Sequence, residues 1–231
     1  MTKYYAADLT RSVEDYLKTI YTLSEAGQPA TTTGIAEALT LAAPSVSGMV
    51  KRLAEAGLLE HLPYHGVTLT ADGRRAALRM LRRHRLIEAY LVKSLGYSWD
   101  TVHDEAERLE HAVSDDLIER MARALGNPRF DPHGDPIPTA DGTMVEVSAV
   151  PLPDVAVGET VMITRVDSSS AERLRWLGDA GLVPGVQVTV LEVQPFSGPI
   201  TLNLGAKQRV VGHDLAQQLH CCRVADTDST G

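Results

Sequence analysis

The chain has 231 residues, of which 44% are hydrophobic and 23% are charged, and its formal net charge is −8. Nearly half of the residues can enter a core, which predicts one large or two modest folded domains. No apolar run approaches the roughly 20 residues of a membrane span, and the first residues lack the apolar stretch of a signal peptide, so we expect a cytoplasmic protein. The two cysteines, Cys221 and Cys222, are adjacent, which excludes a disulfide framework and favours buried strand residues over a metal or redox site.

The negative total conceals an uneven distribution of charge. Residues 1–95 contain 12 Lys and Arg against 9 Asp and Glu, a net charge of +3, and the rest of the chain carries −11. Eight of the basic residues fall within one stretch of 35 residues: Lys51, Arg52, Arg74, Arg75, Arg79, Arg82, Arg83 and Arg85. A solvated helix face would explain this cluster, and so would a surface for an anionic partner such as DNA. The net charge therefore does not exclude DNA binding.

The first 70 residues predict a winged helix-turn-helix. Apolar residues recur at helical spacing from Ser12 until Gly27, and two shorter helices follow, around residues 35–39 and from Pro44 to Gly57. Two β-rich runs, residues 58–62 and 67–70, flank a turn and predict a hairpin.

The remaining pattern predicts helices followed by a small barrel. One long helix is expected over residues 71–93 and a second over residues 100–125, each with an apolar stripe. Residues 127–157 hold six of the twelve prolines and predict a domain boundary. Four short β-rich runs follow, at residues 160–166, 187–193, 200–204 and 208–211. We expect a mainly α protein with a small β-barrel, and these parts: a winged helix at 1–72, a helical domain at 73–140, a linker at 141–157, a barrel domain at 158–226 and a disordered tail at 227–231.

Histidines and carboxylates gather on the two long predicted helices. On the second, steps of four, three and one residue place four of them within roughly a 100° arc: His103, Glu107, Glu110 and His111. On the first, His84 and Glu88 are one turn apart. A single helical histidine is most often an ordinary surface residue, but such a gathering would be costly to bury without a cation. A divalent metal site is the favoured interpretation.

These segments resemble a known family. The winged helix, the segments Arg83-His84-Arg85-Leu86-Ile87-Glu88 and His103-Asp104-Glu105-Ala106-Glu107-Arg108-Leu109-Glu110-His111, and the linker Pro132-His133-Gly134-Asp135-Pro136-Ile137-Pro138 look like the diphtheria toxin repressor family of metal-dependent transcription regulators. The later segments Leu182-Val183-Pro184-Gly185 and Gly212-His213-Asp214-Leu215-Ala216 resemble the SH3-like domain of the ferrous-iron transport A type. The resemblance implies a homodimeric regulator, which is not an enzyme.

The resemblance implies two metal sites. The first would use Asp15, Glu107, Glu110 and His111, and the second His84, Glu88 and His103. From the residues alone, Asp15 could instead close a capping box with Ser12. Because Ser170 and Arg173 stand where the iron-sensing members have ligands in the SH3-like domain, Glu172 is a further candidate ligand.

The ligand types point to the metal. Iron-sensing members carry a thioether and a thiol where this chain has Asp15 and Glu107, whereas manganese-sensing members carry Asp and Glu there. Oxygen ligands suit harder ions, so Mn²⁺ is the expected cofactor and Fe²⁺ the second choice. Manganese-specific members also have a Glu at the position of Lys18, so we expect two separated sites instead of a closely spaced pair.

The resemblance places the third helix in the major groove of an inverted-repeat operator, with metal strengthening the binding. The expected DNA contacts are Pro44, Ser45, Ser47, Gly48, Lys51 and Arg52, with His65 at the wing. Capping or plain exposure would equally explain the two serines. The related repressors carry Gln in place of Gly48, so a different sequence preference is expected. The implied role is repression of metal-uptake genes, without a membrane partner or a small-molecule substrate.

Two other classes stay open at this point. A metalloenzyme or metal-storage bundle also places Glu and His at helical spacing, but it uses Glu-x-x-His pairs, which this chain lacks. An adaptor that binds proline-rich peptides would need an aromatic-lined groove, and the C-terminal part offers only Trp176 and Phe196.

Overall fold

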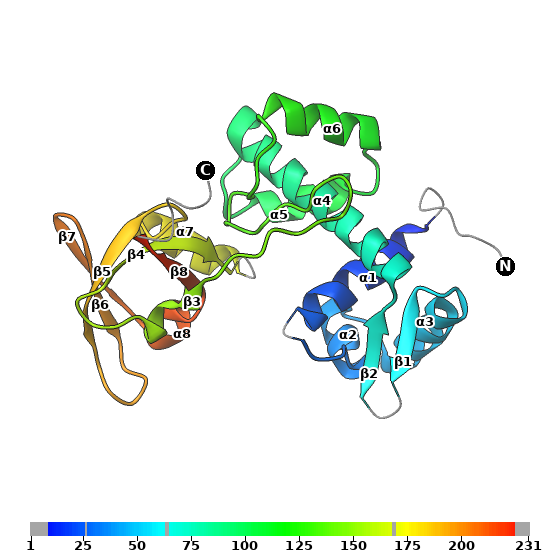
Figure 1. The fold of residues 1–231 in the computed structure, drawn as a ribbon, viewed down its shortest axis with the longest axis horizontal. Helices are drawn as coiled ribbons and strands as arrows, with labels where there is room; N and C mark the ends of the chain where they lie inside the picture. The colour runs from blue at the N-terminus through cyan, green and yellow to red at the C-terminus, as the bar shows by residue number, and fades with distance from the viewer. Residues whose placement is uncertain (1–8, 26, 63–64, 168–169, 225–231) are drawn as a thin grey trace. The chain divides into compact units, whose positions relative to one another are not determined.

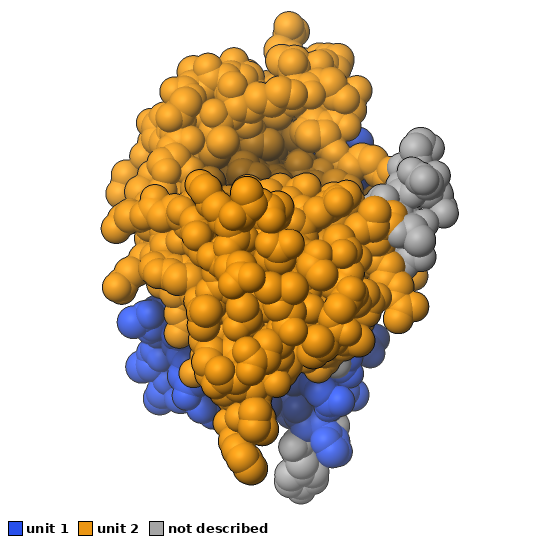
Figure 2. Space-filling model, turned by 90° about the vertical axis from the view of Figure 1, so that its left-hand side faces the viewer, with its two compact units in different colours: residues 1–84, 110–113, 138–144 blue, residues 85–109, 114–137, 145–231 orange. Residues whose placement is uncertain are grey.

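The computed structural model describes residues 9–25, 27–62, 65–167 and 170–224. The chain divides into two compact units, coloured blue and orange in Figure 2. Unit 1 consists of residues 1–84, 110–113 and 138–144, and unit 2 consists of residues 85–109, 114–137 and 145–231. The predicted disordered tail lies outside the described residues. No helix in the described part of the chain combines the length and apolar character that crossing a bilayer requires.

Unit 1 contains a winged helix-turn-helix (Figure 1). Its elements are α1 (Arg11–Ser24), α2 (Thr32–Leu39), α3 (Ala43–Glu55), β1 (Leu59–Leu62), β2 (Gly66–Leu69) and the first part of α4 (Ala71–Leu95). The strands pair antiparallel from Leu59↔Leu69 to Leu62↔Gly66, which confirms the predicted hairpin. Gly66 has φ +117°, and a Cβ there would collide with the Ala30 carbonyl, so β2 must begin with glycine.

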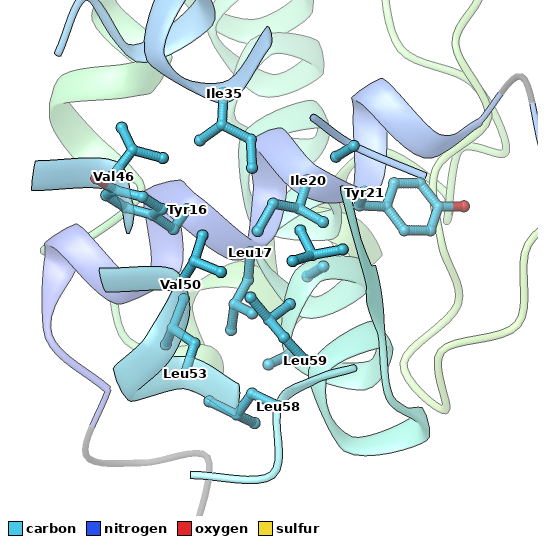
Figure 3. Close-up of a cluster of buried hydrophobic side chains, with 14 of the residues drawn as sticks. Tyr16, Leu17, Ile20, Tyr21, Ile35, Val46, Val50, Leu53, Leu58 and Leu59 are labelled. Carbon is cyan, nitrogen blue, oxygen red and sulfur yellow. The ribbon is translucent and has the colours of Figure 1, made fainter. Parts of the chain in front are cut away.

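The core of unit 1 is centred on α1 (Figure 3). Leu17 and Ile20 are fully buried and point toward apolar side chains of α2 and α3, including Ile35 and Val50. Each such side chain contributes about 1.5–3 kcal/mol on burial. Because the three helices share one core, the position of α1 fixes the position of α3.

The helix starts show how local sequence sets these elements. Thr31 caps α2, since its hydroxyl accepts a hydrogen bond from the Gly34 N–H at 3.0 Å. α1 begins at Arg11 with Thr10 as its N-cap residue, and Thr10 makes no side-chain capping bond. Ser12 therefore lies inside the helix and is not its N-cap residue, so the alternative of a capping box between Ser12 and Asp15 is excluded, and the Asp15 carboxylate is available for another role.

The single helix predicted over residues 100–125 was also wrong. The chain forms α5 (Val102–Leu109) and α6 (Asp115–Ala124), separated by residues 110–114. Ser114 caps α6, because its hydroxyl accepts a hydrogen bond from the Leu117 N–H at 3.3 Å, and the acidic pair Asp115 and Asp116 favours a helix start at this position. His103 and Glu107 thus lie on α5, while Glu110 and His111 lie beyond its end.

Unit 2 combines the rest of α4, α5 and α6 with a β domain (Figure 1). The β domain contains β3 (Val150–Pro151), a 3₁₀ turn (Leu152–Asp154), β4 (Thr160–Val166), α7 (Ala171–Ala180), β5 (Gln187–Val193), β6 (Ile200–Leu204), β7 (Lys207–Val211), α8 (His213–Ala216) and β8 (Leu219–Arg223). The strands form an antiparallel sheet in the order β3-β8-β4-β5-β6-β7. On β8, Cys221 is buried as predicted and Cys222 is half-buried. Burial raises the pKa of the Cys221 thiol to about 12, so this thiol stays protonated at neutral pH in the absence of a metal ion.

The β domain contacts the turn formed by residues 131–135. The Val166 N–H on β4 donates to the His133 carbonyl at 2.8 Å. Gly134 has φ +89°, and a Cβ there would collide with the Thr164 carbonyl. On α7, Arg175 Nη2 lies 3.1 Å from the Asp100 carboxylate. The hydrogen bond from Val166 and the close approach of Gly134 to Thr164 place the turn directly against β4 within unit 2.

Candidate metal centre

The first candidate centre lies in unit 1 and contains Asp15, Glu110 and His111. His111 Nε2 is 2.8 Å from Asp15 Oδ1 and 3.5 Å from Glu110 Oε1. The atoms that the three residues offer lie within 4.8 Å of one another. α1 supplies Asp15, and the segment between α5 and α6 supplies the other two. These atoms lie close enough to coordinate one ion, and the set combines oxygen and nitrogen ligands.

The orientation of His111 favours a cation at this centre. Its Nδ1 lies 2.8 Å from Glu14 Oε2, so in the neutral ring the hydrogen sits on Nδ1 and Nε2 presents a lone pair. Nε2 is buried and makes no hydrogen bond, because the 2.8 Å approach of Asp15 lacks hydrogen-bond geometry. An orphaned lone pair that faces two carboxylates fits a metal ion.

Glu110 is fully buried and accepts from two groups in unit 1. His84 Nδ1 lies 2.5 Å from Oε2, and Lys18 Nζ lies 2.6 Å from Oε1. Burial raises the pKa of Glu110, but the hydrogen bond from His84 and the charge of Lys18 outweigh this and hold the pKa below its ordinary value. Glu110 is therefore a carboxylate at neutral pH and is available as a ligand.

Replacing the partner of His111 tests its role in positioning that ring. We expect Glu14→Gln to lower the metal affinity of this centre about tenfold, because outer carboxylates orient ligand histidines and raise their basicity. Calorimetric titration with Mn²⁺ measures the effect. Glu37→Gln on the exposed face of α2 is the matched control. An affinity of Glu14→Gln within twofold of the parent would contradict the role.

The second candidate centre lies in unit 2 around Glu88 on α4. Its Oε1 is 3.2 Å from His103 Nδ1, and its Oε2 is 3.8 Å from His133 Nδ1. Glu88, Asp131 and His133 offer atoms that all lie within 4.8 Å of one another. On the other side of the His103 ring, Nε2 lies 3.8 Å from Glu107 Oε1.

His133 and Asp131 are held firmly at this second centre. His133 Nε2 donates to the Trp99 carbonyl at 2.8 Å and the ring stacks on Trp99, so in the neutral ring Nδ1 carries the lone pair, on the side of Glu88. Asp131 Oδ1 accepts from the His133 and Asp135 N–H groups at 2.8 and 3.0 Å. Burial and the charges of Asp135 and Glu88 raise the pKa of Asp131 well above its usual range, against the opposing effect of Arg85. A cation would relieve this repulsion.

The structure distributes the predicted ligands as follows. Asp15, Glu110 and His111 come together in unit 1, where His84 contacts Glu110. Glu88, His103 and Glu107 lie together in unit 2. Glu172 is exposed in the first turn of α7 and belongs to none of the converging ligand groups among the described residues.

Sequence reasoning assigned no ligand role to Glu14, Asp131 or His133. Neighbouring helical residues point in different directions, so the carboxylates of Glu14 and Asp15 were not expected to contact the same side chain, His111. Asp131 and His133 lie in the proline-rich stretch, where no helical period marks a shared face. The sequence Asp-Pro-His-Gly-Asp was a usable clue, because in an Asx turn the Asp131 carboxylate accepts from the His133 backbone N–H, which brings this carboxylate close to residue 133.

The predicted DNA-reading residues share one exposed side of α3. Val46, Val50 and Leu53 are buried on its opposite side. The exposed residues are Pro44, Ser45, Ser47, Gly48, Lys51 and Arg52. His65 is exposed in the turn between β1 and β2, and residues 63–64 of that turn lie outside the described residues. The helix thus presents short side chains near its N-terminus and two cations further along.

Comparison with known proteins identifies this arrangement. Residues 8–67 match the profile described as "Iron dependent repressor, N-terminal DNA binding domain", and residues 70–139 match "Iron dependent repressor, metal binding and dimerisation domain". The chain belongs to the iron-dependent repressor family. Residues 150–221 match the FeoA domain, which agrees with the predicted SH3-like domain.

Members of this family align with almost the whole chain. The iron-dependent repressor IdeR of Mycobacterium leprae is 34% identical over 90% of this chain and 96% of the relative. The diphtheria toxin repressor of Corynebacterium diphtheriae is 32% identical over 92% of this chain and 97% of the relative. A solved structure of a manganese-dependent transcriptional repressor in complex with manganese is 40% identical, covers 91% of this chain and 99% of its own, and has a TM-score of 0.86.

Membership decides between the classes that the sequence left open. The family consists of metal-dependent DNA-binding repressors with a dimerisation domain, and these are not enzymes. The predictions of the family, the fold class and a non-enzymatic function are therefore confirmed. The metalloenzyme, metal-storage and peptide-adaptor alternatives are set aside.

Proposed function

We propose that this repressor responds to Mn²⁺, with Fe²⁺ as the second candidate. We further propose that it acts in the cytoplasm and controls the expression of metal-uptake genes. The observation that carries the proposal is the centre at Asp15, Glu110 and His111, whose ligand atoms are oxygen and nitrogen. Sulfur ligands would favour softer metals, whereas carboxylates suit Mn²⁺. Glu107 is kept as a proposed fourth ligand of this centre, as expected from the sequence.

The same centre provides a link to DNA. Asp15 belongs to α1, which shares the core of unit 1 with the reading helix α3. Glu110 and His111 belong to the segment that follows α5. A bound ion would supply positive charge among these groups. Asp15 would then hold α1, and with it α3, in one orientation. The α1–α3 core would thus have two states, and the bound ion would favour one of them.

The proposed DNA complex is a homodimer on an inverted repeat. Two recognition helices must lie about 34 Å apart to enter successive major grooves, so a fixed orientation of α3 strengthens binding. Lys51 and Arg52 would contact phosphates, and the short side chains at Pro44, Ser45, Ser47 and Gly48 would allow close approach to the bases. His65 would approach the adjacent minor groove.

We propose a second metal site around Glu88. Its support is the convergence of Glu88, Asp131 and His133, and the contact between Glu88 and His103. The sequence-based grouping of His84 with Glu88 and His103 is retained as a proposal, as is Glu172. The domain limits at residues 72, 140, 157 and 226 are likewise proposed.

A metal titration of DNA binding tests the function. Fluorescence anisotropy with a labelled inverted-repeat duplex would compare Mn²⁺, Fe²⁺, Zn²⁺ and Co²⁺ against a chelator control. We expect Mn²⁺ at micromolar concentrations to tighten binding about 5- to 150-fold, the usual range of allosteric coupling. Equal affinity with and without chelator would refute the metal switch. A response to Fe²⁺ at lower concentration than to Mn²⁺ would reassign the metal.

A further inference from the structure

Lys18 occupies a position at the first centre that the proposed function does not explain. It follows Asp15 by three residues on α1, so both side chains lie on the same side of the helix. The Lys18 side chain is 15% exposed, and its ammonium lies 2.6 Å from Oε1 of the fully buried Glu110. A positive charge is thus already present at the centre.

The ammonium contacts the oxygen that a metal would need. Oε2 of Glu110 is taken by His84 at 2.5 Å. Oε1 is the oxygen that faces His111 Nε2, at 3.5 Å, and it is also the oxygen that Lys18 contacts. An ion coordinated by Asp15, Glu110 and His111 would therefore lie beside the ammonium and compete with it for one carboxylate oxygen.

We propose that Lys18 is a tethered competitor of the metal ion, and that it sets the metal concentration at which the repressor responds. This inference rests on the proposed function, because it assumes that a divalent ion binds at Asp15, Glu110 and His111. Without metal, Lys18 compensates the buried charge of Glu110, which would be costly alone. When an ion enters, Lys18 must release Oε1 or remain as a repelling charge at short range. Both effects weaken metal binding.

A purely supporting role for Lys18 predicts the opposite result. If the ammonium only held Glu110 in the orientation that the metal needs, removing it would weaken metal binding. If Lys18 competes with the metal, removing it strengthens binding. The direction of the change therefore distinguishes the two roles.

The test is a calorimetric titration with Mn²⁺ in a Glu88→Gln background, which removes the proposed second site. We expect Lys18→Met to bind Mn²⁺ about tenfold more tightly or better. Lys18→Arg, which keeps the charge, should stay within about threefold of the background protein. Lys207→Met, an exposed lysine on β7, makes the same change in net charge and should leave the affinity unchanged. An equal or weaker affinity of Lys18→Met would overturn the proposal.

Two further measurements keep the test decisive. Lys18→Met leaves Glu110 without its cation in chelator, so we expect a lower melting temperature there and a larger rise with Mn²⁺ than for the background protein. Should Lys18→Met not fold, Lys18→Gln supplies a neutral N–H donor and takes its place, with the same expected direction. Asp15→Ala in the Glu88→Gln background tests the proposed function separately: undiminished Mn²⁺ binding would refute the site itself, whatever Lys18 does.

Discussion

Asp15→Ala is expected to abolish the metal-dependent gain in DNA affinity while leaving the metal-free affinity unchanged. Asp15 contributes the carboxylate of α1 at the first centre, 2.8 Å from His111 Nε2. Its removal takes away the proposed ligand that would connect a bound ion to the core shared by α1 and α3. The whole coupling, about 5- to 150-fold in affinity, should therefore be lost.

The measurement is DNA binding by anisotropy, in chelator and at saturating Mn²⁺, for the parent and the variant. Asp72→Ala is the matched control, because Asp72 is an exposed residue at the start of α4 and its removal changes the net charge equally. The control should keep the full response to Mn²⁺. A retained response in Asp15→Ala would show that DNA affinity is coupled to another part of the protein.

The fold could be predicted from the sequence where its determinants are local. The strands β4, β5 and β6 begin and end at the predicted residues, because short apolar runs bounded by glycines are recognisable without knowing which strand they pair with. The first helix of unit 1 followed from the helical period of its apolar residues, and the hairpin followed from two β-rich runs on either side of a turn. The break between α5 and α6 did not, because the apolar stripe continues through Val113 and Leu117 and conceals the start at Ser114.

The candidate centres followed only in part, because their geometry depends on distant contacts. Asp15, Glu110 and His111 were grouped through the resemblance, and no spacing along the chain relates α1 to His111. The partner of His111 is 97 residues away in sequence, at Glu14. Similarly, Lys18 and Glu110 are 92 residues apart. Helical spacing predicted that Glu107 and Glu110 lie on one face of a single helix. The helix α5 ends at Leu109, so this spacing does not apply to Glu110.

Asp131→Asn is expected to stabilise the metal-free protein at neutral pH and to remove the stabilisation that metal gives through the second centre. The folded protein raises the pKa of Asp131 through burial and the charges of Asp135 and Glu88. A carboxyl group with a raised pKa binds a proton more tightly when folded, so its contribution to stability falls as the pH rises above its unfolded value of about 4. Asn at position 131 carries no charge and so avoids this loss of stability. Its side-chain oxygen can still accept the two hydrogen bonds that the His133 and Asp135 N–H groups donate to Asp131 Oδ1.

Chemical denaturation in chelator between pH 4 and pH 8 measures this difference. The free energies of unfolding of parent and variant should coincide near pH 4 and separate at higher pH, by at most about 1.4 kcal/mol per pH unit, with the variant more stable. The metal measurement is made in an Asp15→Ala background, which removes the proposed first site. There, metal at about 100 times its dissociation constant should stabilise the background protein by about 2.7 kcal/mol and the Asp131→Asn variant far less. Asp116→Asn, at an exposed residue of α6, should keep the pH dependence and the metal stabilisation of the protein it is made in. A parent that is more stable than Asp131→Asn at pH 7 in chelator would contradict the prediction. It would mean that Arg85 fully compensates the charge of Asp131, so that a metal ion would have no repulsion to relieve at the turn of residues 131–135.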